Sequence, residues 1–215
     1  MRTWALEDHS LQQRRPPGAD EVLAGVIDAI GQADFGHRLL VQLNRLLPVG
    51  SVSAYLLSQG GLPQLITTAT QVSPDRTAEV WRAYCGDVHR LDRTFDACWN
   101  SPGSLLTHHR KDAFTTPHQR LVYDPLQTQE RLSLAVPCDG GRLLAVNLYR
   151  CVGQRWFSLE EAEAVGSLAR PLVACVKQQA KGCGRRHPAR RPTPARCAPG
   201  WPACAAGSRR ANSTW

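Results

Sequence analysis

The segment from residue 181 to residue 215 constrains the fold more than any other, because it lacks the large apolar side chains from which a hydrophobic core is built. It contains no Leu, Ile, Val, Phe, Met or Tyr and no Asp or Glu, and it is rich in Ala, Pro, Gly and Arg. Such a composition buries too little apolar surface to offset the entropy lost when a chain becomes ordered. We therefore predict that residues 181–215 form a disordered tail and that no second compact domain is built there.

The positive charge of the sequence is concentrated in the same tail. The formal net charge is +8, which by itself suggests a nucleic-acid partner. Eight of the 26 Lys and Arg residues lie in 181–215, and removing them leaves 18 basic residues to balance 18 acidic ones. The body of the chain is thus neutral, and we expect only weak, non-specific and salt-sensitive DNA binding through the tail.

The cysteines and the N-terminal sequence indicate a reducing compartment. Eight cysteines occur at irregular spacings without a Cys-x-x-Cys pair, which favours free thiols over a disulfide framework. Residues 1–19 have no apolar run of the kind found in signal peptides, and no stretch approaches about 18 uninterrupted apolar residues. We predict a cytoplasmic protein with no membrane segment, and a flexible leader over residues 1–19.

Hydrophobic periodicity over residues 20–180 predicts a single α+β domain. Apolar residues at helical spacing alternate with strand-like runs, and turn residues such as Asp139-Gly140-Gly141 separate the runs. The expected helices cover 20–30, 34–47, a segment opening at Pro74, 117–126 and a closing helix after 158; the expected strands cover 51–57, 64–70, 131–137 and 143–149. Asp20 is expected to cap the first helix. The pattern predicts an antiparallel sheet with helices packed on one side.

The closing helix has the best-defined beginning. Ser158 and Glu161 have the spacing of a capping box, in which each side chain bonds the other residue's backbone N–H. An apolar stripe follows at helical spacing: Val165, Leu168, Ala169, Leu172, Val173 and Val176. Pro171 lies within this stripe and is expected to kink or shift the helix. The stripes of the first and last helices serve either packing within the domain or dimerisation.

Four segments carry a family resemblance: FGHRLLVQLNRLLPVGSVSAYLL, WRAYCGDVHRLD, ERLSLAVPCDGGRLLAVNLYR and FSLEEAEAVGSLARPLVACV. Together they resemble the N-terminal GAF/PAS-like sensor domain of LuxR-type helix-turn-helix transcriptional regulators, over roughly residues 20–180. The resemblance implies a small-molecule ligand, a homodimer formed through terminal helices, and a DNA-binding domain after the closing helix. An alternative is a stand-alone GAF-like interaction module that dimerises with regulators or sequesters them.

The DNA-binding part that the resemblance implies is not encoded in the tail. In such regulators it typically opens with a Leu-Thr-x-Arg-Glu phrase, whereas here Gln179 is followed by AKGCGRRHPARRPTPARCAPG. A helix-turn-helix requires amphipathic helices, which this composition cannot supply. We therefore expect a truncated regulator without sequence-specific DNA binding, and a reading-frame shift in GC-rich coding DNA is one explanation for the tail.

Aromatic residues mark the expected ligand site. In sensor domains of this type the ligand lies between the sheet and the middle helices, which is where several aromatic residues and one acid fall. Asp92, after Tyr84, is similar to the Tyr/Asp pair that autoinducer-binding relatives use for an acyl-homoserine lactone. The residue types alone favour ordinary core packing, and the resemblance favours a pocket. The candidate ligand-binding residues are Tyr55, Trp81, Tyr84, Asp92, Trp99 and Tyr123.

Other chemistry has weaker support in the sequence. Cys85 and His89 lie one helical turn apart, which permits a thiolate–imidazole pair, but helix packing accounts for them better. The histidines at 108, 109 and 118 are predicted to lie in a solvated loop, and Cys183, His187, Cys197 and Cys204 match no zinc module. No phosphate loop or nucleophile elbow is present in the sequence. We predict no catalytic residues, no metal, no cofactor and no enzymatic activity.

Overall fold

The computed structural model describes residues 2–6, 15–86 and 88–186, and the side chains as far as residue 182. Its centre is a six-stranded antiparallel sheet in the order β1-β4-β5-β6-β2-β3. The strands are β1 (Arg2–Ala5), β2 (Ser51–Ser58), β3 (Gln64–Thr70), β4 (Leu105–Arg110), β5 (Thr128–Cys138) and β6 (Arg142–Cys151). The predicted tail lies almost wholly outside the described residues, since it is described only as far as residue 186.

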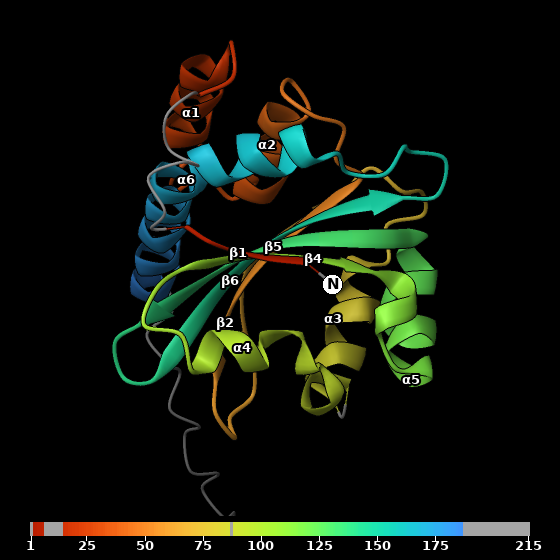
Figure 1. Ribbon diagram of the computed structural model, residues 1–215. Helices are drawn as coiled ribbons and strands as arrows, with labels where there is room; N and C mark the ends of the chain where they lie inside the picture. The colour runs from red at the N-terminus through yellow and green to blue at the C-terminus, as the bar shows by residue number, and fades with distance from the viewer. Residues whose placement is uncertain (1, 7–14, 87, 187–215) are drawn as a thin grey trace, which may run out of the picture.

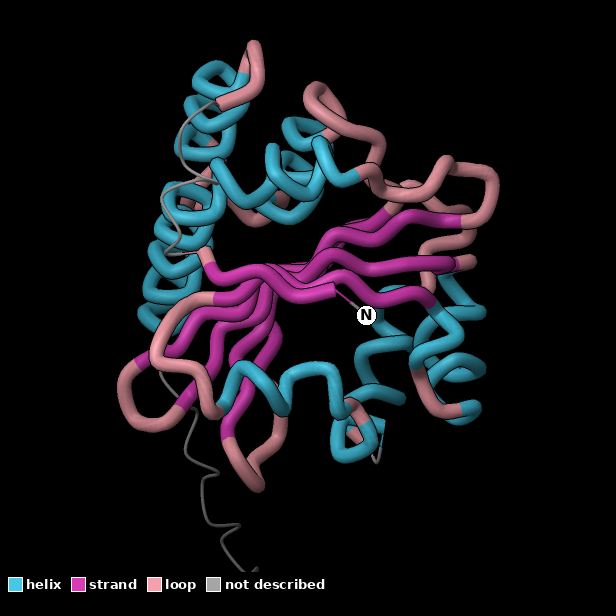
Figure 2. Tube along the Cα trace, in the orientation of Figure 1, coloured by secondary structure: helices cyan, strands magenta, loops and turns pink. Residues whose placement is uncertain are grey.

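Helices cover both faces of this sheet (Figure 1). One face carries α1 (Ala19–Asp28), α2 (Phe35–Leu43) and α6 (Leu159–Arg186), and the other carries α3 (Thr77–Cys85), α4 (Asp96–Trp99) and α5 (Thr116–His118). A π-helical segment, Gln119–Tyr123, continues directly from α5. Figure 2 shows the resulting three layers, with the strands between two groups of helices. The α+β fold with a flanked antiparallel sheet is confirmed, but the expectation of helices on one side only is wrong.

The alternation of side chains along each strand produces two different cores. Leu132 and Leu134 of β5 point toward α1, α2 and α6, where they join a large core of Leu, Val, Ala and Phe. Arg131 and Ser133 occupy the intervening positions and face the opposite way. The second core, beneath α3 and α4, is smaller and contains Tyr84 among its members. The sheet therefore has an apolar face and a face that includes buried polar residues.

Both predicted hairpins are present. β2 pairs with β3, and β5 pairs with β6 in a register that places Ala135 opposite Ala145. Gly140 and Gly141 adopt φ values of 72° and 64° at the second turn, a left-handed conformation that glycine reaches without strain. Local turn chemistry thus fixes the register of the two longest strands.

Several boundaries differ from the sequence expectation, among them the following four. Residues 2–5 of the expected flexible leader form β1, in which Trp4 pairs with Leu106 of β4 at the sheet edge. α1 begins at Ala19, so Gly18, with a φ of 80°, occupies the N-cap position in place of Asp20, which lies inside the helix. α3 begins at Thr77 and not at Pro74. α6 runs on through Pro171 and past residue 180 to Arg186.

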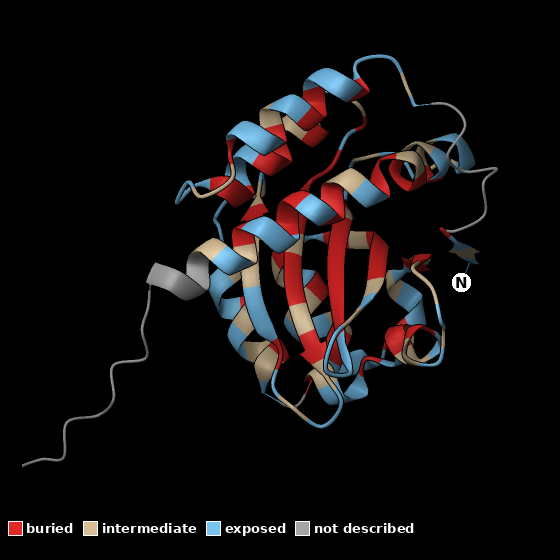
Figure 3. Cartoon of the chain, turned by 90° about the vertical axis from the view of Figure 1, so that its left-hand side faces the viewer, coloured by how far each residue is buried: buried red, intermediate tan, exposed pale blue. Residues whose placement is uncertain are grey.

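The apolar stripe of α6 packs within the chain. All six of its residues are buried, the most exposed being Val173 at 7 %. Figure 3 shows the buried side of α6 against the sheet and its exposed side outward. The sequence pattern therefore reflects packing within the domain, and dimerisation through the terminal helices stays a prediction that no longer rests on this stripe. Among the described residues, no helix is long and apolar enough to cross a membrane.

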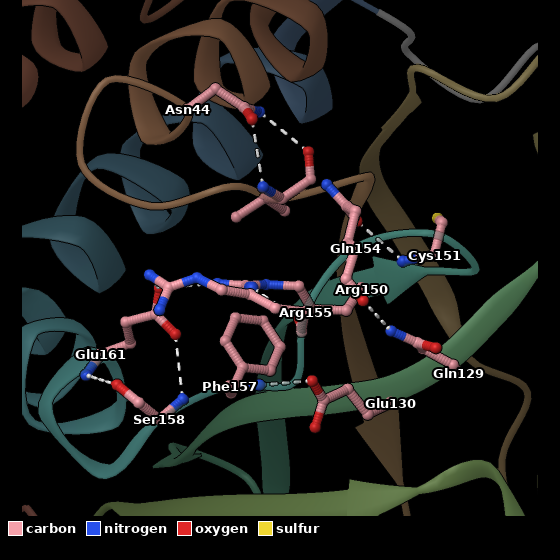
Figure 4. Close-up of polar contacts among 11 residues, drawn as sticks. Asn44, Gln129, Glu130, Arg150, Cys151, Gln154, Arg155, Phe157, Ser158 and Glu161 are labelled. Atoms are coloured by element: carbon pink, nitrogen blue, oxygen red, sulfur yellow. Dashed lines mark hydrogen bonds and ion pairs between the residues drawn. The ribbon is translucent and has the colours of Figure 1, made fainter.

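A polar cluster fixes the N-terminus of α6 to the sheet (Figure 4). The predicted capping box is confirmed, since Glu161 N–H donates to Ser158 Oγ at 3.2 Å and Ser158 N–H donates to Glu161 Oε2 at 2.9 Å. Glu161 Oε1 also accepts from the guanidinium groups of Arg150 and Arg155, each at 2.8 Å. The helix cap is thereby joined to β6 by a charge-assisted contact.

Glu130 of β5 holds the segment that precedes α6. Its side chain is fully buried and accepts from the Phe157 N–H at 2.5 Å and from His108 Nε2 at 2.6 Å. The Arg150 guanidinium lies 4.3 Å from the centroid of the Phe157 ring. Glu130 therefore faces the α6 side of the sheet, whereas its neighbour Arg131 faces the other side.

Candidate functional site

The sheet face beneath α3 and α5 has a polar floor. Ser133 Oγ donates to Asn147 Oδ1 at 2.7 Å, and Asn147 Nδ2 donates to Ser53 Oγ at 3.2 Å. Ser53 Oγ in turn lies 3.0 Å from the Tyr149 hydroxyl. This chain of hydrogen bonds crosses β5, β6 and β2 and satisfies groups that would otherwise be costly to bury.

A buried cation lies at the edge of this floor. Arg131 is 1 % exposed, and its Nη1 donates to Asp92 Oδ2 at 3.3 Å. Its Nη2 donates to Thr94 Oγ1. The guanidinium carbon lies 5.0 Å from the Phe95 ring centroid and 4.9 Å from that of Phe114, distances at which the ring quadrupoles attract a cation. The charge of Arg131 is thus balanced by Asp92 and sheltered by aromatic rings.

Asp92 already accepts hydrogen bonds at both of its oxygens. The Tyr84 hydroxyl donates to Oδ2 at 3.2 Å beside Arg131, and Thr94 donates to Oδ1 from both its backbone N–H and its hydroxyl. Burial is the largest single influence on the pKa of Asp92 and would raise it. The Arg131 charge, His118 and the Thr94 hydrogen bonds together exceed this effect, so the pKa falls below the usual 3.8. Asp92 is therefore an ionised carboxylate whose acceptor positions are filled by the protein.

Three aromatic rings form one wall above the floor. Tyr55 of β2 lies 5.5 Å, between ring centroids, from both Trp81 and Tyr84 of α3, and the two α3 rings are 5.8 Å apart. Because residues 81 and 84 are three apart in a helix, their side chains lie on one face of α3 and meet Tyr55 together. Tyr55 and Tyr84 are buried, whereas Trp81 is half-buried and has one edge near solvent.

The opposite wall comes from the segment after β4. Tyr123 is 4.6 Å from Phe114 and 5.4 Å from His118 between ring centroids, and His118 is 4.6 Å from Phe114. His118 and Tyr123 are both essentially inaccessible to solvent. Burial lowers the pKa of His118 to about 4, although Asp92 opposes the shift, so this ring is neutral near pH 7.

A cavity of about 40 Å³ lies between these walls. That volume holds about three water molecules. Its lining includes Arg131 and Tyr149 from the sheet and Trp81 and Val122 from the helical layer. Trp81 and Val122 are partly exposed, so the cavity is closed on its outer side by side chains that reach the surface.

Several polar atoms at this cavity have no hydrogen-bond partner within the described residues. They are the Tyr123 hydroxyl, both ring nitrogens of His118, and Arg131 Nε. Each belongs to a residue that lines the cavity. Buried polar groups in native proteins are nearly always paired, so unpaired atoms gathered around one cavity point to an occupant that pairs with them.

The structure brings together most of the predicted site residues. Tyr55, Trp81, Tyr84 and Tyr123 line the cavity, and Asp92 contacts it through Tyr84 and Arg131. Trp99 does not line the cavity; it borders a separate open cleft of about 450 Å³ beside the β2–β3 turn. Four of the six residues therefore line the cavity. Asp92 borders the same open cleft as Trp99 and is joined to the cavity lining through its contacts with Tyr84 and Arg131.

Sequence reasoning missed Arg131, His118 and Phe114. Arg131 alternates with Leu132 and Leu134, so a sheet covered on one side would have placed it in solvent. His118 and His109 were predicted in a solvated loop, and that prediction is wrong because both are buried. Burial also lowers the pKa of His109, to about 3. The signal available was the small, uncharged character of the positions that follow Arg131 on the same face, Ser133 and Ala135, which is unusual for a solvent-exposed face.

Cys85 and His89 each contact other residues, whereas the side chains of the Cys183, His187, Cys197 and Cys204 set lie outside the part of the chain that the structure describes. Cys85 Sγ contacts the Pro63 carbonyl oxygen at 3.9 Å, and His89 Nδ1 lies 3.1 Å from the Tyr84 carbonyl oxygen, so their polar contacts are with other residues. His108 and His109 point to opposite faces of the sheet, as adjacent strand residues must. Within the described part of the chain, no group of three His, Cys, Asp or Glu side chains is placed to hold a metal ion.

The neutral, buried state of His118 predicts a loss of stability in acid. Its pKa is about 4 in the folded state and near 6.5 in the unfolded chain. Between these two pH values the unfolded chain is protonated at His118 and the folded chain is not. The free energy of unfolding should therefore decline as the pH falls from 6.5 toward 4. Between pH 7 and pH 5 this decline should be about 2 kcal/mol smaller in His118→Phe than in the unaltered protein. Urea unfolding at several pH values measures this, and an unchanged slope in the variant would contradict it. The His118 ring resonances should titrate near pH 4.

Comparisons with known proteins reveal similarity of structure and none of sequence. No protein-family model matches the chain, and no curated protein matches it. The ligand-binding domain of VqsR from Pseudomonas aeruginosa superposes with a TM-score of 0.60 at 19 % identity, covering 78 % of this chain and 99 % of that one.

Two further structures superpose at lower similarity. CepR2 from Burkholderia cenocepacia, an N-acylhomoserine lactone-dependent LuxR family transcription factor, has a TM-score of 0.51 at 14 % identity and covers 77 % of this chain and 94 % of its own. The phycoerythrobilin-bound GAF domain of a cyanobacterial phytochrome has a TM-score of 0.51 at 10 % identity. This match covers 79 % of this chain and 96 % of that domain. The described chain therefore has the GAF-like fold that LuxR-type ligand-binding domains share.

Proposed function

We propose that this protein is the sensor part of a LuxR-like transcriptional regulator and that its cavity between the sheet and α3 binds a small molecule. The observation that carries the proposal is the set of buried, unpaired polar atoms around the cavity. A cavity meant only for packing would be lined by apolar groups, since unpaired buried polar atoms destabilise a fold.

The comparisons support the same proposal. CepR2 is described as dependent on an N-acylhomoserine lactone, and the phytochrome GAF domain is described with a bound bilin. Both have the fold of this chain, and small-molecule sites commonly lie between layers of a fold, with apolar walls and a few polar groups. The aromatic walls and polar floor of this cavity have that composition.

The binding proposal is tested by filling the cavity. Val122 is partly exposed and lines the cavity, so Val122→Phe should occupy the space with little strain. A thermal-shift screen of small molecules should give compounds that raise the melting temperature of the unaltered protein and not of the variant. Val41→Phe, the same substitution at a 45 % exposed position of α2 on the opposite face, should leave the response intact. Equal responses in all three proteins would contradict a ligand site here.

We also propose that the chain regulates without reading a DNA sequence itself and that it has no enzymatic activity. The part on DNA rests on the composition of residues 181–215, which lack aliphatic side chains larger than Ala, and the part on enzymatic activity rests on the lack of a phosphate loop or nucleophile elbow in the sequence. A mobility-shift assay at physiological salt should show at most weak binding that is lost as salt rises. A saturable, sequence-selective complex would overturn this part of the proposal. The same proposal places the protein in the cytoplasm, as a small-molecule receptor that acts on transcription.

A further inference from the structure

The exposed side of α1 is acidic and contains no basic residue. Asp20, Glu21 and Asp28 are exposed, and α1 contains no Lys, Arg or His. Asp20 forms an ion pair with Arg15 at 2.7 Å, whereas the side chains of Glu21 and Asp28 form no ion pair or hydrogen bond with any described residue. Ile27, which is 54 % exposed, lies between them in the sequence. α1 thus presents two free carboxylates beside an exposed apolar side chain.

The exposed side of α6 is basic beyond its first turns. After Glu163 the helix contains Lys and Arg but no Asp or Glu. Arg170, Lys177 and Lys181 are exposed, and their side chains form no ion pair or hydrogen bond with any described residue. Because these three positions are seven and four residues apart, they lie along one side of the helix. α6 thus presents a row of free cations.

α1 and α6 lie next to each other on the outside of the molecule (Figure 1). Ala19, at the start of α1, belongs to one cluster of buried residues with Leu168 of α6. Just beyond the end of α1, the Gly31 N–H donates to Gln179 Oε1 at 2.6 Å. These two contacts are separated by 12 positions in one segment and by 11 in the other, so the helices point in the same direction and stay level with each other.

The charges on the two helices match in spacing. Glu21 is level with Arg170, and Asp28 is level with Lys177, to within about one residue. In each helix the two charges are seven residues apart, which is about 10 Å along the helix axis. Because no ion pair joins these four side chains within the described chain, all four are available to a partner.

A partner for this two-helix surface must carry charges of both signs. The phosphates of a nucleic acid would be attracted to α6 and repelled by α1 beside it, and a cationic partner would meet the reverse. A second copy of the chain carries both charges at the same spacing. A two-fold rotation about an axis parallel to the helices places α1 of one copy on α6 of the other and leaves the levels unchanged.

We propose that two copies of this chain associate through the exposed sides of α1 and α6, with α1 of each copy lying on α6 of its partner. Glu21 then pairs with the partner's Arg170 and Asp28 with the partner's Lys177, and the symmetry repeats both pairs. Association also covers Ile27, which is otherwise in water. The proposal specifies the helix faces, the axis and the ion pairs. It rests on unpaired surface charges and not on the cavity or on the buried stripe of α6.

Charge reversal on one helix at a time tests the proposal with the full chain. Exposed ion pairs are individually weak and are screened by salt, so the unaltered protein should dimerise at low ionic strength, with a dissociation constant that rises with salt. Glu21→Lys/Asp28→Lys and Arg170→Glu/Lys177→Glu each set like charges against one another. Each double variant alone should therefore dimerise at least about a hundredfold more weakly, as measured by analytical ultracentrifugation.

A mixture of the two double variants provides the sharpest measurement. In a mixed pair the reversed α1 lies on the reversed α6, and both contacts of the pair again join opposite charges. The mixture should therefore form heterodimers although neither variant forms homodimers, and a chain with all four reversals should dimerise like the unaltered protein. A misfolded variant could not produce this recovery.

The matched control is Glu79→Lys/Asp112→Lys, which makes the same change in net charge at exposed positions of α3 and of the turn after β4. This variant should dimerise like the unaltered protein. A monomeric unaltered protein at low salt, dimers that survive in both double variants, or a mixture without heterodimers would each overturn the proposal. None of these results bears on ligand binding in the cavity, which the thermal-shift comparison tests separately.

Discussion

Replacing Arg131 with methionine is expected to lower the free energy of unfolding by about 3–5 kcal/mol. The substitution keeps most of the side-chain volume and its packing against Phe95 and Phe114 but removes the charge. Asp92 then stays buried with no cation beside it, and Thr94 loses a donor. Unfolding in urea, followed by circular dichroism, measures the loss, and a change below about 1 kcal/mol would show that Asp92 does not depend on Arg131.

The double variant Arg131→Met/Asp92→Leu separates charge from packing. Replacing a buried ion pair by apolar residues of similar size is often neutral, so we expect this variant to regain most of the stability lost by Arg131→Met.

The pH dependence of stability should also differ between Arg131→Met and the unaltered protein. In the unaltered protein the pKa of Asp92 is lower in the folded state than in the unfolded chain, where it is near 3.9. Asp92 therefore stabilises the fold at pH values above 3.9, and this contribution is lost as the pH falls through the folded-state pKa. In Arg131→Met no cation opposes the effect of burial, which raises the pKa of Asp92. The difference in free energy of unfolding between this variant and the unaltered protein should therefore shrink as the pH falls toward 4.

Replacing Arg150 with methionine is expected to cost about 3 kcal/mol, whereas Arg155→Met should cost less than about 1 kcal/mol. Both arginines donate to the same oxygen, Glu161 Oε1, at the same distance of 2.8 Å. They differ in burial, because the Arg150 side chain is 0 % exposed and that of Arg155 is 68 % exposed. Arg150 also donates to the Arg155 carbonyl oxygen at 2.7 Å, which would be left unpaired.

This pair is its own control, because the two variants remove the same charge from the same carboxylate. Urea unfolding of both proteins, in low and high salt, tests the comparison. Screening should weaken the small contribution of Arg155 and leave that of Arg150 nearly unchanged. Equal losses in the two variants would mean that burial does not determine the strength of this contact.

The elements that the sequence predicted best are those whose signals are local. The capping box at Ser158 and Glu161 is complete within four residues, and the Gly140-Gly141 turn fixes its hairpin without help from distant residues. The closing helix follows from a six-residue apolar stripe with a regular period. None of these requires knowledge of what packs against the element.

The features that escaped prediction depend on contacts far apart in the sequence. β1 has four residues and owes its existence to pairing with β4, about a hundred positions later. The helices between 77 and 126 were expected in part, but nothing in their short segments shows that they cover the face of the sheet opposite to α1, α2 and α6. Because the second covered face was not foreseen, the burial of Arg131 and His118 on that side could not be foreseen either.

The candidate site was predictable in part. The resemblance to sensor domains directed attention to Tyr84 and Asp92, and the structure places the Tyr84 hydroxyl 3.2 Å from the Asp92 carboxylate. Arg131, the partner of Asp92, comes from β5, 39 positions further along the chain, so no spacing rule links it to these residues. Whether these residues bind a ligand stays a prediction.

The placement of Glu130 and Arg131 on opposite faces of β5 has a consequence for signal transmission. Only one peptide bond separates the cation beside the cavity from the carboxylate that holds the Phe157 backbone ahead of α6. A twist of this strand, which is hydrogen-bonded on both sides, would tilt the two side chains together in opposite directions. We therefore expect that an occupant which shifts Arg131 also displaces Glu130, and through its hydrogen bond to Phe157 the segment that leads into α6, without the participation of a loop.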